Sequence, residues 1–313
     1  MALIEEAVGA PPQAGGAPTP GRRVFASLRR RPAVLLSVGF IALITLMAVT
    51  APLLTKLSGH GPLRFDSAAI DPALGGIPRG ALGGISADHW FGVEPQNGRD
   101  IFARIVYGAR TSLLIALAGT ALTTLIGVVL GMLAGFYRGW ADQAISRVMD
   151  FLMAFPSLIF MIALLSSLPS GNRPVLLVLV LSLFGWPYIA RVIRGQTLSL
   201  ANREFVEAAR ASGAGRKAIV FKEILPNLKG TIIVMSTLAV PGYIGTEAGL
   251  SFLGVGVNPP TPSWGKMIYT AVGWYATDPM YFLIPGTFLF LTVLSFTVLG
   301  DHLRRELDAG EAA

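Results

Sequence analysis

The sequence contains no cysteine, which excludes disulfide bonds, thiolate chemistry and cysteine-based metal sites. Histidine is also scarce. The three present, His60, His89 and His302, lie far apart in the chain and form no ligand cluster at a recognisable spacing, so the sequence predicts no metal site. Charged residues make up only 14% of the chain, whereas a soluble domain usually carries about 25%. This deficit argues against a soluble domain.

Sequence signatures of catalysis are missing as well. A phosphate-cradling G-x-x-x-x-G-K-[ST] loop is absent, and the nearest candidates, "GAGRKA" and "WGKM", lack the glycine spacing and the hydroxyl. No nucleophile–base or metal constellation can be assembled from the sequence. We therefore predict a chain that is not an enzyme and carries no cofactor. If ATP drives its action, ATP and Mg²⁺ belong to a partner chain.

Apolar residues are abundant and clustered. They form 53% of the chain and occur in runs near the roughly 20 residues that cross a hydrocarbon core. Strands of a membrane barrel would be about half as long and would alternate in polarity. The sequence therefore predicts an all-α integral membrane protein with six transmembrane helices. The six predicted spans are 33–56, 111–136, 148–168, 174–193, 231–253 and 280–300.

The basic residues predict how the chain is oriented. Most of the 25 Lys and Arg fall in an N-terminal tail (1–32), in the connections 137–147 and 194–230, and in a C-terminal tail (301–313). Because cytoplasmic loops carry an excess of Lys and Arg, both termini are predicted to be cytoplasmic, in a cell membrane. Segment 57–110 then becomes an extracytoplasmic loop, and 111–300 a five-helix core. Topology accounts for the net charge of +7, so nucleic acid is not needed as a partner. The tail 1–32, rich in Ala, Gly and Pro, is predicted to be disordered.

The connection 194–230 contains the charged stretch "FVEAARASGAGRKAIVFKEILPN". It predicts two short helices: Asn202 caps the first, Gly213 ends it, and Pro226 ends the second. Phe205, Ala208, Ala209 and Ser212 lie along one stripe of the first helix, at i, i+3, i+4 and i+7. On this pattern alone, a helix that binds a partner and an amphipathic helix that lies on lipid headgroups are equally compatible.

The register of this stretch resembles the membrane subunits of binding-protein-dependent ABC importers. Their signature is Glu-Ala-Ala, three residues, Gly, then about nine residues and Ile-x-Leu-Pro. The matching positions are Glu207, Ala208, Ala209, Gly213, Leu225 and Pro226, whereas Ile224 stands one position later than in the general signature. The resemblance implies a type I importer-like permease. It also implies that this loop is a coupling helix seated in a groove of an ATP-hydrolysing subunit.

Three further stretches resemble the second permease subunit of dipeptide and oligopeptide importers. They are "HWFGVEPQNGRDIFARIVYGARTSL" (89–113), "TEAGLSFLGVGVNPPTPSWGKM" (246–267) and "LTVLSFTVLGDHLRRELD" (291–308). The resemblance implies a lipid-embedded complex with a homologous permease, two ATP-binding subunits or one fused chain, and an extracytoplasmic binding protein. Peptide cargo is implied in the same way. Nickel chelates, oligosaccharides and an ion-coupled secondary transporter remain alternatives.

Candidate cargo contacts are Glu247, Tyr243 and Trp264. Glu247 is the acid deepest in a predicted span, where a carboxylate is costly and often functional. It either faces a water-filled path or hydrogen-bonds its neighbours inside the bundle. Trp264, together with Trp274, Tyr275 and Tyr281, either contacts cargo or belongs to an interfacial aromatic belt.

Overall fold

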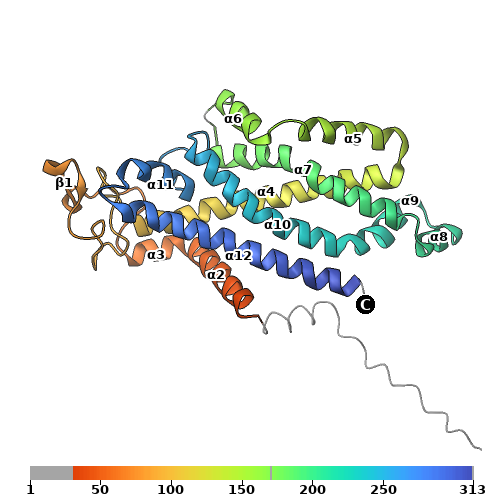
Figure 1. The fold of residues 1–313 in the computed structure, drawn as a ribbon, viewed down its shortest axis with the longest axis horizontal. Coiled ribbons are helices and arrows are strands. Elements are labelled where there is room, and N and C mark those ends of the chain that lie inside the picture. The colour runs from red at the N-terminus through yellow and green to blue at the C-terminus, as the bar shows by residue number, and fades with distance from the viewer. Residues whose placement is uncertain (1–30, 170, 312–313) are drawn as a thin grey trace, which may run out of the picture.

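Long helices dominate the computed structural model, which describes residues 31–169 and 171–311. Helices α4, α7, α10 and α12, whose bounds are given below, run along the long axis of the molecule together with α5 (Gly139–Met153). Helix α2 crosses them obliquely (Figure 1). Five helices are long and apolar enough to cross a membrane, and a bent pair supplies a sixth span if it is counted as one. The five are α2 (Pro32–Val49), α4 (Ile101–Tyr137), α7 (Arg173–Leu200), α10 (Leu225–Phe252, preceded by helical residues from Arg216) and α12 (Pro279–Glu311). The predicted all-α membrane fold is confirmed.

The predicted loop 57–110 is too long at its C-terminal end. Helix α4 begins at Ile101 rather than 111, and the Asp100 carboxylate caps it by accepting a hydrogen bond from the Ala103 N–H at 2.7 Å. The first turns of α4 are buried in the apolar core, with Ile101 and Ile105 fully covered. Arg104 and Arg110 lower the hydropathy of this stretch, which hid the helix from a hydropathy reading. The first span also differs from 33–56, because Thr50 separates α2 from the short α3 (Ala51–Leu57).

The third predicted span, 148–168, is not one helix. It is divided between α5 and α6 (Ser157–Ser167), which meet at 86°. Pro156 stands at the bend with ψ at 101°, outside the helical range. Proline has no N–H for the helix ladder and its ring disfavours a helical conformation in the residue before it. The break therefore has a local cause in the sequence.

Three glycines set the contact between α4 and α7. Gly127, Gly131 and Gly135 follow one another at intervals of four, and a Cβ on any of them would meet α7 atoms at 2.7–2.8 Å. A stripe of small residues at this spacing lets two membrane helices approach until their backbones nearly touch. The two helices therefore pack as a closely fitted unit.

The ends of the molecule differ in character. At one end lie β1 (Ile70–Asp71) and β2 (Ile77–Pro78), an antiparallel pair in which Ile70 faces Pro78, with two 3₁₀ turns (Ser67–Ala69 and Pro72–Leu74). Helix α11 (Trp264–Ala271), followed by a 3₁₀ turn (Val272–Trp274), covers the same end. Helices α8 (Glu204–Ala211) and α9 (Arg216–Ala218) lie at the opposite end (Figure 1).

The two predicted tails fare differently. Residues 1–30 of the predicted disordered tail lie outside the described residues, and Pro32 already belongs to α2. The predicted cytoplasmic C-terminal tail 301–313 is helical as far as Glu311, because α12 continues unbroken to that residue, and its cytoplasmic position stays a prediction. Leu, Arg and Glu dominate this stretch and all favour a helix.

Candidate functional site

Helix α8 carries the Glu-Ala-Ala segment and ends at the predicted glycine. Gly213 has φ +82°, the left-handed conformation that glycine adopts without steric cost. The Gly213 N–H donates to the Arg210 carbonyl and the Ala214 N–H to the Ala209 carbonyl, each at 3.0 Å. This pair of bonds is the Schellman termination. The predicted start is wrong: Arg203 is the N-cap, and the Asn202 side chain instead accepts a hydrogen bond from Arg138 at 2.9 Å.

One residue of α8 anchors the helix to the rest of the protein. Val206 is fully buried in an apolar cluster that joins α4, α7, the segment before α10 and α10 itself. We call this the anchor cluster, and its buried members are Val128, Met132, Ile189, Ile193, Ala201, Val206, Ile219, Val220, Ile224 and Leu228. Any force on α8 therefore reaches three long helices through one set of contacts. The predicted stripe of Phe205, Ala208, Ala209 and Ser212 missed this residue.

The predicted stripe faces outward instead. Phe205, Ala208 and Ser212 are exposed, as is Glu207, and only Ala209 is partly covered by the anchor cluster. Phe205 keeps 38% of its surface exposed. Small alanines beside an exposed aromatic ring and a single carboxylate form a surface that another backbone can approach closely. The first two residues of the Glu-Ala-Ala segment are thus presented rather than buried.

The second half of the loop is not a separate helix ended by Pro226. Helix α9 continues into a π-helical segment (Ile219–Ile224) and then directly into α10, with Pro226 in the first turn of α10. The Leu225 N–H bonds to the Val220 carbonyl, five residues back, which is the π pattern. The wider π turn shifts the backbone hydrogen bonds at the position of Pro226. Proline has no N–H to donate there, and its ring would clash with the carbonyl one turn back in a regular α-helix. Ile224 is buried in the anchor cluster, Leu225 packs against it, and Pro226 is exposed.

Two cavities border α10. One, about 360 Å³, lies between α7 and α10 and is mostly apolar. Its lining residues are Gly185, Tyr188, Ile189, Met235, Leu238, Ala239, Gly242, Tyr243 and Thr246. A second, wider groove of about 690 Å³ lies among α4, α10 and α12. The predicted cargo residue Tyr243 lines the first cavity, and its hydroxyl donates to the Thr123 hydroxyl at 2.9 Å.

The other two predicted cargo residues are buried. Glu247 is fully covered, and its two oxygens accept hydrogen bonds from the hydroxyls of Ser112 and Ser251, both at 2.8 Å. Trp264 is also fully covered, and its indole N–H donates to the Ile105 carbonyl at 3.1 Å. Neither residue lines the two cavities beside α10. Their placement favours the structural interpretation of both. Trp264, and Tyr281 at 3% exposure, do not belong to a surface aromatic belt, whereas Tyr275 is exposed.

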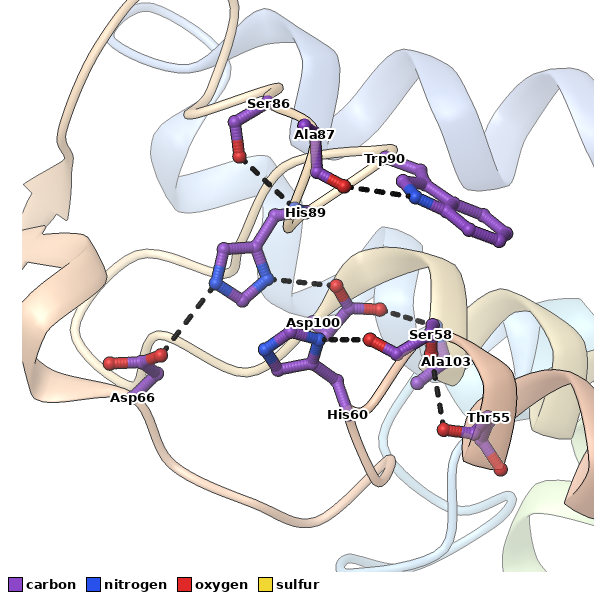
Figure 2. Close-up of polar contacts among 10 residues, drawn as sticks. All are labelled: Thr55, Ser58, His60, Asp66, Ser86, Ala87, His89, Trp90, Asp100 and Ala103. Atoms are coloured by element: carbon purple, nitrogen blue, oxygen red, sulfur yellow. Dashed lines mark hydrogen bonds and ion pairs between the residues drawn. The ribbon is translucent and has the colours of Figure 1, made fainter.

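The histidines correct the prediction that they form no cluster. His60 and His89, far apart in the chain, lie with ring centres 4.3 Å apart, and Asp100 completes a group whose donor atoms all lie within 4.8 Å of one another (Figure 2). The premise that the histidines do not cluster is wrong for these two. Beside this group, Arg99 pairs with Glu94 at 2.7 Å, and Asp100 pairs with His89 at 2.9 Å. Sequence spacing carries no signal for contacts between three loop segments.

Comparison with known proteins agrees with this architecture. The sequence profile of the binding-protein-dependent transport system inner membrane component family matches residues 127–309, more than half of the chain. A second profile, the N-terminal transmembrane domain of oligopeptide transport permease C, matches residues 19–69.

Three curated relatives illustrate the similarity. The oligopeptide transport system permease protein OppC of Bacillus subtilis is 39% identical, with 90% of this chain and 88% of the relative covered. The dipeptide transport system permease protein DppC of Alkalihalophilus pseudofirmus is 37% identical, with 93% and 90% covered. The glutathione transport system permease protein GsiD of Salmonella typhimurium is 39% identical, with 93% and 90% covered.

A solved structure shows a related fold. The chain is similar to a structure of the MetNI methionine ABC transporter in an inward-facing conformation, with a TM-score of 0.53. The similarity covers 65% of this chain and 96% of that chain at 20% sequence identity. At this level of identity, the comparison supports the fold alone.

Proposed function

Since the chain belongs to the binding-protein-dependent transport system inner membrane components, we propose that it is a permease subunit of an ATP-driven importer for dipeptides or oligopeptides. The relatives named above are permeases for oligopeptides, dipeptides and glutathione, which supports short peptides as the cargo class. The chain itself makes or breaks no bond in the cargo. It provides half of a pathway, and a homologous permease provides the other half.

The proposal rests on the position of α8, which is exposed on one face and buried on the other. Its Glu-Ala-Ala face is exposed, while Val206 on its other face is buried in the anchor cluster. An exposed face offers a contact to an ATP-hydrolysing subunit, and a buried anchor transmits movement of that subunit inward. We place Glu207, Ala208, Ala209 and Gly213 at this contact, with Ile224, Leu225 and Pro226 forming its inner edge.

Ile189 connects the anchor cluster with the cavity between α7 and α10. It packs in the anchor cluster and also lines the cavity, and Met235 on α10 does both as well. A displacement of α8 that shifts this cluster would therefore change the shape of the cavity. Tyr243 lies on the cavity wall, and we assign the cavity to this subunit's half of the cargo pathway. On the placement described above, Glu247 and Trp264 support the pathway from behind rather than touch cargo.

The orientation follows from the positive-inside rule. Residues 191–229, from the last turns of α7 to the start of α10, hold eight Lys and Arg residues, and with α8 in the cytoplasm they lie on the side where such residues are enriched. The loop between α3 and α4 is then extracytoplasmic, where a binding protein delivers cargo. ATP and Mg²⁺ would be held by two ATP-binding subunits or by one fused chain. Both termini of a multi-pass chain in the cell membrane would face the cytoplasm.

Co-purification from native membranes tests the proposal with a matched pair of variants. Gly213 and Gly254 both have left-handed φ values, and a Cβ on either would meet no atom within 4 Å. The wild type is expected to bring down an ATPase, a second permease and a binding protein. Gly213→Asp should lose only the ATPase, and Gly254→Asp, beyond the far end of α10, should keep it. Equal loss in both variants, or a wild type that purifies alone, would overturn the assignment.

Energy coupling separates the proposal from ion-coupled secondary transport. Uptake into sealed vesicles should require ATP and persist in the presence of an uncoupler. Uptake that an uncoupler abolishes while ATP is present would favour the secondary transporter. Competition with nickel chelates and oligosaccharides against short peptides would test the cargo class in the same assay.

A further inference from the structure

We propose that the loop between α3 and α4 contains a binding site for a divalent transition metal, with zinc the best fit. Its ligands would be the Nε2 atoms of His60 and His89 and the carboxylate of Asp66. Three separate segments supply these side chains: the end of α3, the start of the 3₁₀ turn at Ser67, and the stretch before α4 (Figure 2). The inference is independent of the proposed transport function.

The hydrogen bonds of the two histidines prepare their Nε2 atoms for a metal. His60 Nδ1 lies 2.8 Å from the Ser58 carbonyl oxygen, which can only accept, so Nδ1 carries the hydrogen. His89 Nδ1 lies 2.9 Å from the Asp100 carboxylate and donates in the same way. A ring that carries its single hydrogen on Nδ1 presents the lone pair of Nε2 to a metal. Metal-binding histidines almost always donate their other ring N–H to a carboxylate or carbonyl, as these two do.

Two aspartates divide the remaining roles. Asp100 is 2% exposed, and its oxygens already accept from the Ala103 N–H and from His89, so it orients the ring rather than binds the metal. Asp66 lies on the other side of His89, with Oδ2 3.7 Å from Nε2 (Figure 2). That distance is too long for a hydrogen bond. It suits two donors of one zinc ion, which at about 2.1 Å from the ion and a tetrahedral angle are roughly 3.4 Å apart.

The surrounding loop holds these groups in place. Asp66 is fixed by the N–H of Ala68, which donates to its Oδ1 at 3.0 Å, and by Gly98, where a Cβ would lie within 1.8 Å of the Asp66 carbonyl oxygen. His89 is buried at 7% exposure and its N–H donates to the Ser86 hydroxyl at 3.0 Å. An ion-pair latch between His89 and the aspartates would account for the two carboxylates but not for the second imidazole, whose ring centre lies 4.3 Å from that of His89.

Two nearby arginines do not oppose a cation at this site directly, because both pair with Glu94. The nitrogen–oxygen distances are 2.7 Å for Arg99 and 2.5 Å for Arg104. Two imidazoles and one carboxylate form a donor set that suits zinc, with water at the fourth position. A bound ion would join the segment after α3 to the start of α4.

The test uses the full-length chain, purified in detergent with a tag that contains no histidine and dialysed against a chelator. Zinc chloride is added, bound zinc is measured by mass spectrometry, and affinity is measured by competition with a chromophoric chelator. The wild type is expected to bind one zinc per chain, and zinc should raise its melting temperature. His60→Ala and Asp66→Asn should each weaken binding at least about tenfold, the effect seen for supporting residues of metal sites.

Asp71→Asn is the matched control. Asp71 caps its 3₁₀ turn as Asp66 does, by accepting from an N–H two residues on at 3.0 Å, but no histidine faces it in the described residues. In both positions an asparagine oxygen can still accept that bond, so Asp71→Asn should bind zinc like the wild type. A wild type without stoichiometric zinc, or equal weakening by the two asparagine variants, would overturn the proposal and leave an ion-pair latch.

Discussion

A single methyl group added at Gly131 is expected to destabilise the protein, because α4 and α7 touch there without spare volume. In the structure a Cβ at this position would lie 2.7 Å from the Ala190 carbonyl oxygen and 2.9 Å from the Ile193 Cβ. Forcing extra volume into a packed interior costs about 1–3 kcal/mol. Replacing glycine by alanine inside a helix returns about 0.5–1 kcal/mol. Gly131→Ala should therefore lower the free energy of unfolding by up to about 2.5 kcal/mol.

Gly195→Ala provides the control on the same pair of helices. Gly195 lies on α7, and a Cβ there would meet no atom within 4 Å. Gly195→Ala should therefore show only the stabilisation that alanine brings to a helix in place of glycine. Gly131→Ala should be less stable than Gly195→Ala by the packing cost alone, about 1–3 kcal/mol. Equilibrium unfolding in mixed micelles measures both variants against the wild type. If Gly131→Ala is as stable as Gly195→Ala, the close contact of α4 and α7 is not what holds them together.

Three further outcomes follow from buried side chains. Val206→Ala removes two methyl groups from the anchor cluster and should lower the free energy that holds α8 in place by about 1.5–3 kcal/mol. Amide exchange in α8 should become faster in this variant, and Phe205→Ala, at an exposed position, should not have this effect. Glu247→Gln should leave ATP-driven uptake within about twofold, since serine hydroxyls can both donate and accept; loss of uptake in a folded variant would restore a cargo role for Glu247. Burial raises the pKa of Asp278, so its charged form is disfavoured in the folded state and stability falls as pH rises from the ordinary value of 3.8 through the raised pKa. Asp278→Asn should therefore gain stability over the wild type at pH 7, and the difference should shrink toward pH 4; a difference that grows on acidification would contradict this.

The sequence predicts the features of the fold that depend on local chemistry. Apolar runs located the membrane helices, and Gly213 ended α8 because a left-handed residue is required there. Pro156 was visible in the third span, but a proline in a membrane helix can be tolerated, so hydropathy alone did not reveal the 86° bend. The start of α4 was hidden because two arginines in its first turns lower the local hydropathy, although Arg104 is buried and paired with Glu94.

Tertiary contacts account for what the sequence did not predict. Val206 and Phe205 are adjacent, and the choice of which one is buried depends on where α4, α7 and α10 lie around α8. The pairing of His60 with His89 depends on a loop whose path is fixed by left-handed glycines and backbone contacts rather than by periodicity. The sequence left the role of Glu247 open because one of its two partners, Ser112, comes from a distant part of the chain.

The same contacts suggest which helix moves when α8 is displaced. The glycine stripe leaves no slack between α4 and α7, so these two helices should move together. Helix α10 has two irregular points, the π segment that leads into it and Pro241 within it, whereas α7 has Pro187 alone; such points are where helices bend. We therefore expect the cavity to open by movement of α10 away from α7. Because the chain has no native cysteine, single cysteines can carry spin labels without background. Labels at the exposed positions Leu183 on α7 and Ile233 on α10 should change their separation between nucleotide-free and ATP-trapped complexes. Labels at Leu133 on α4 and Leu183 should keep theirs, and a larger change in this second pair would place the moving boundary between α4 and α7 instead.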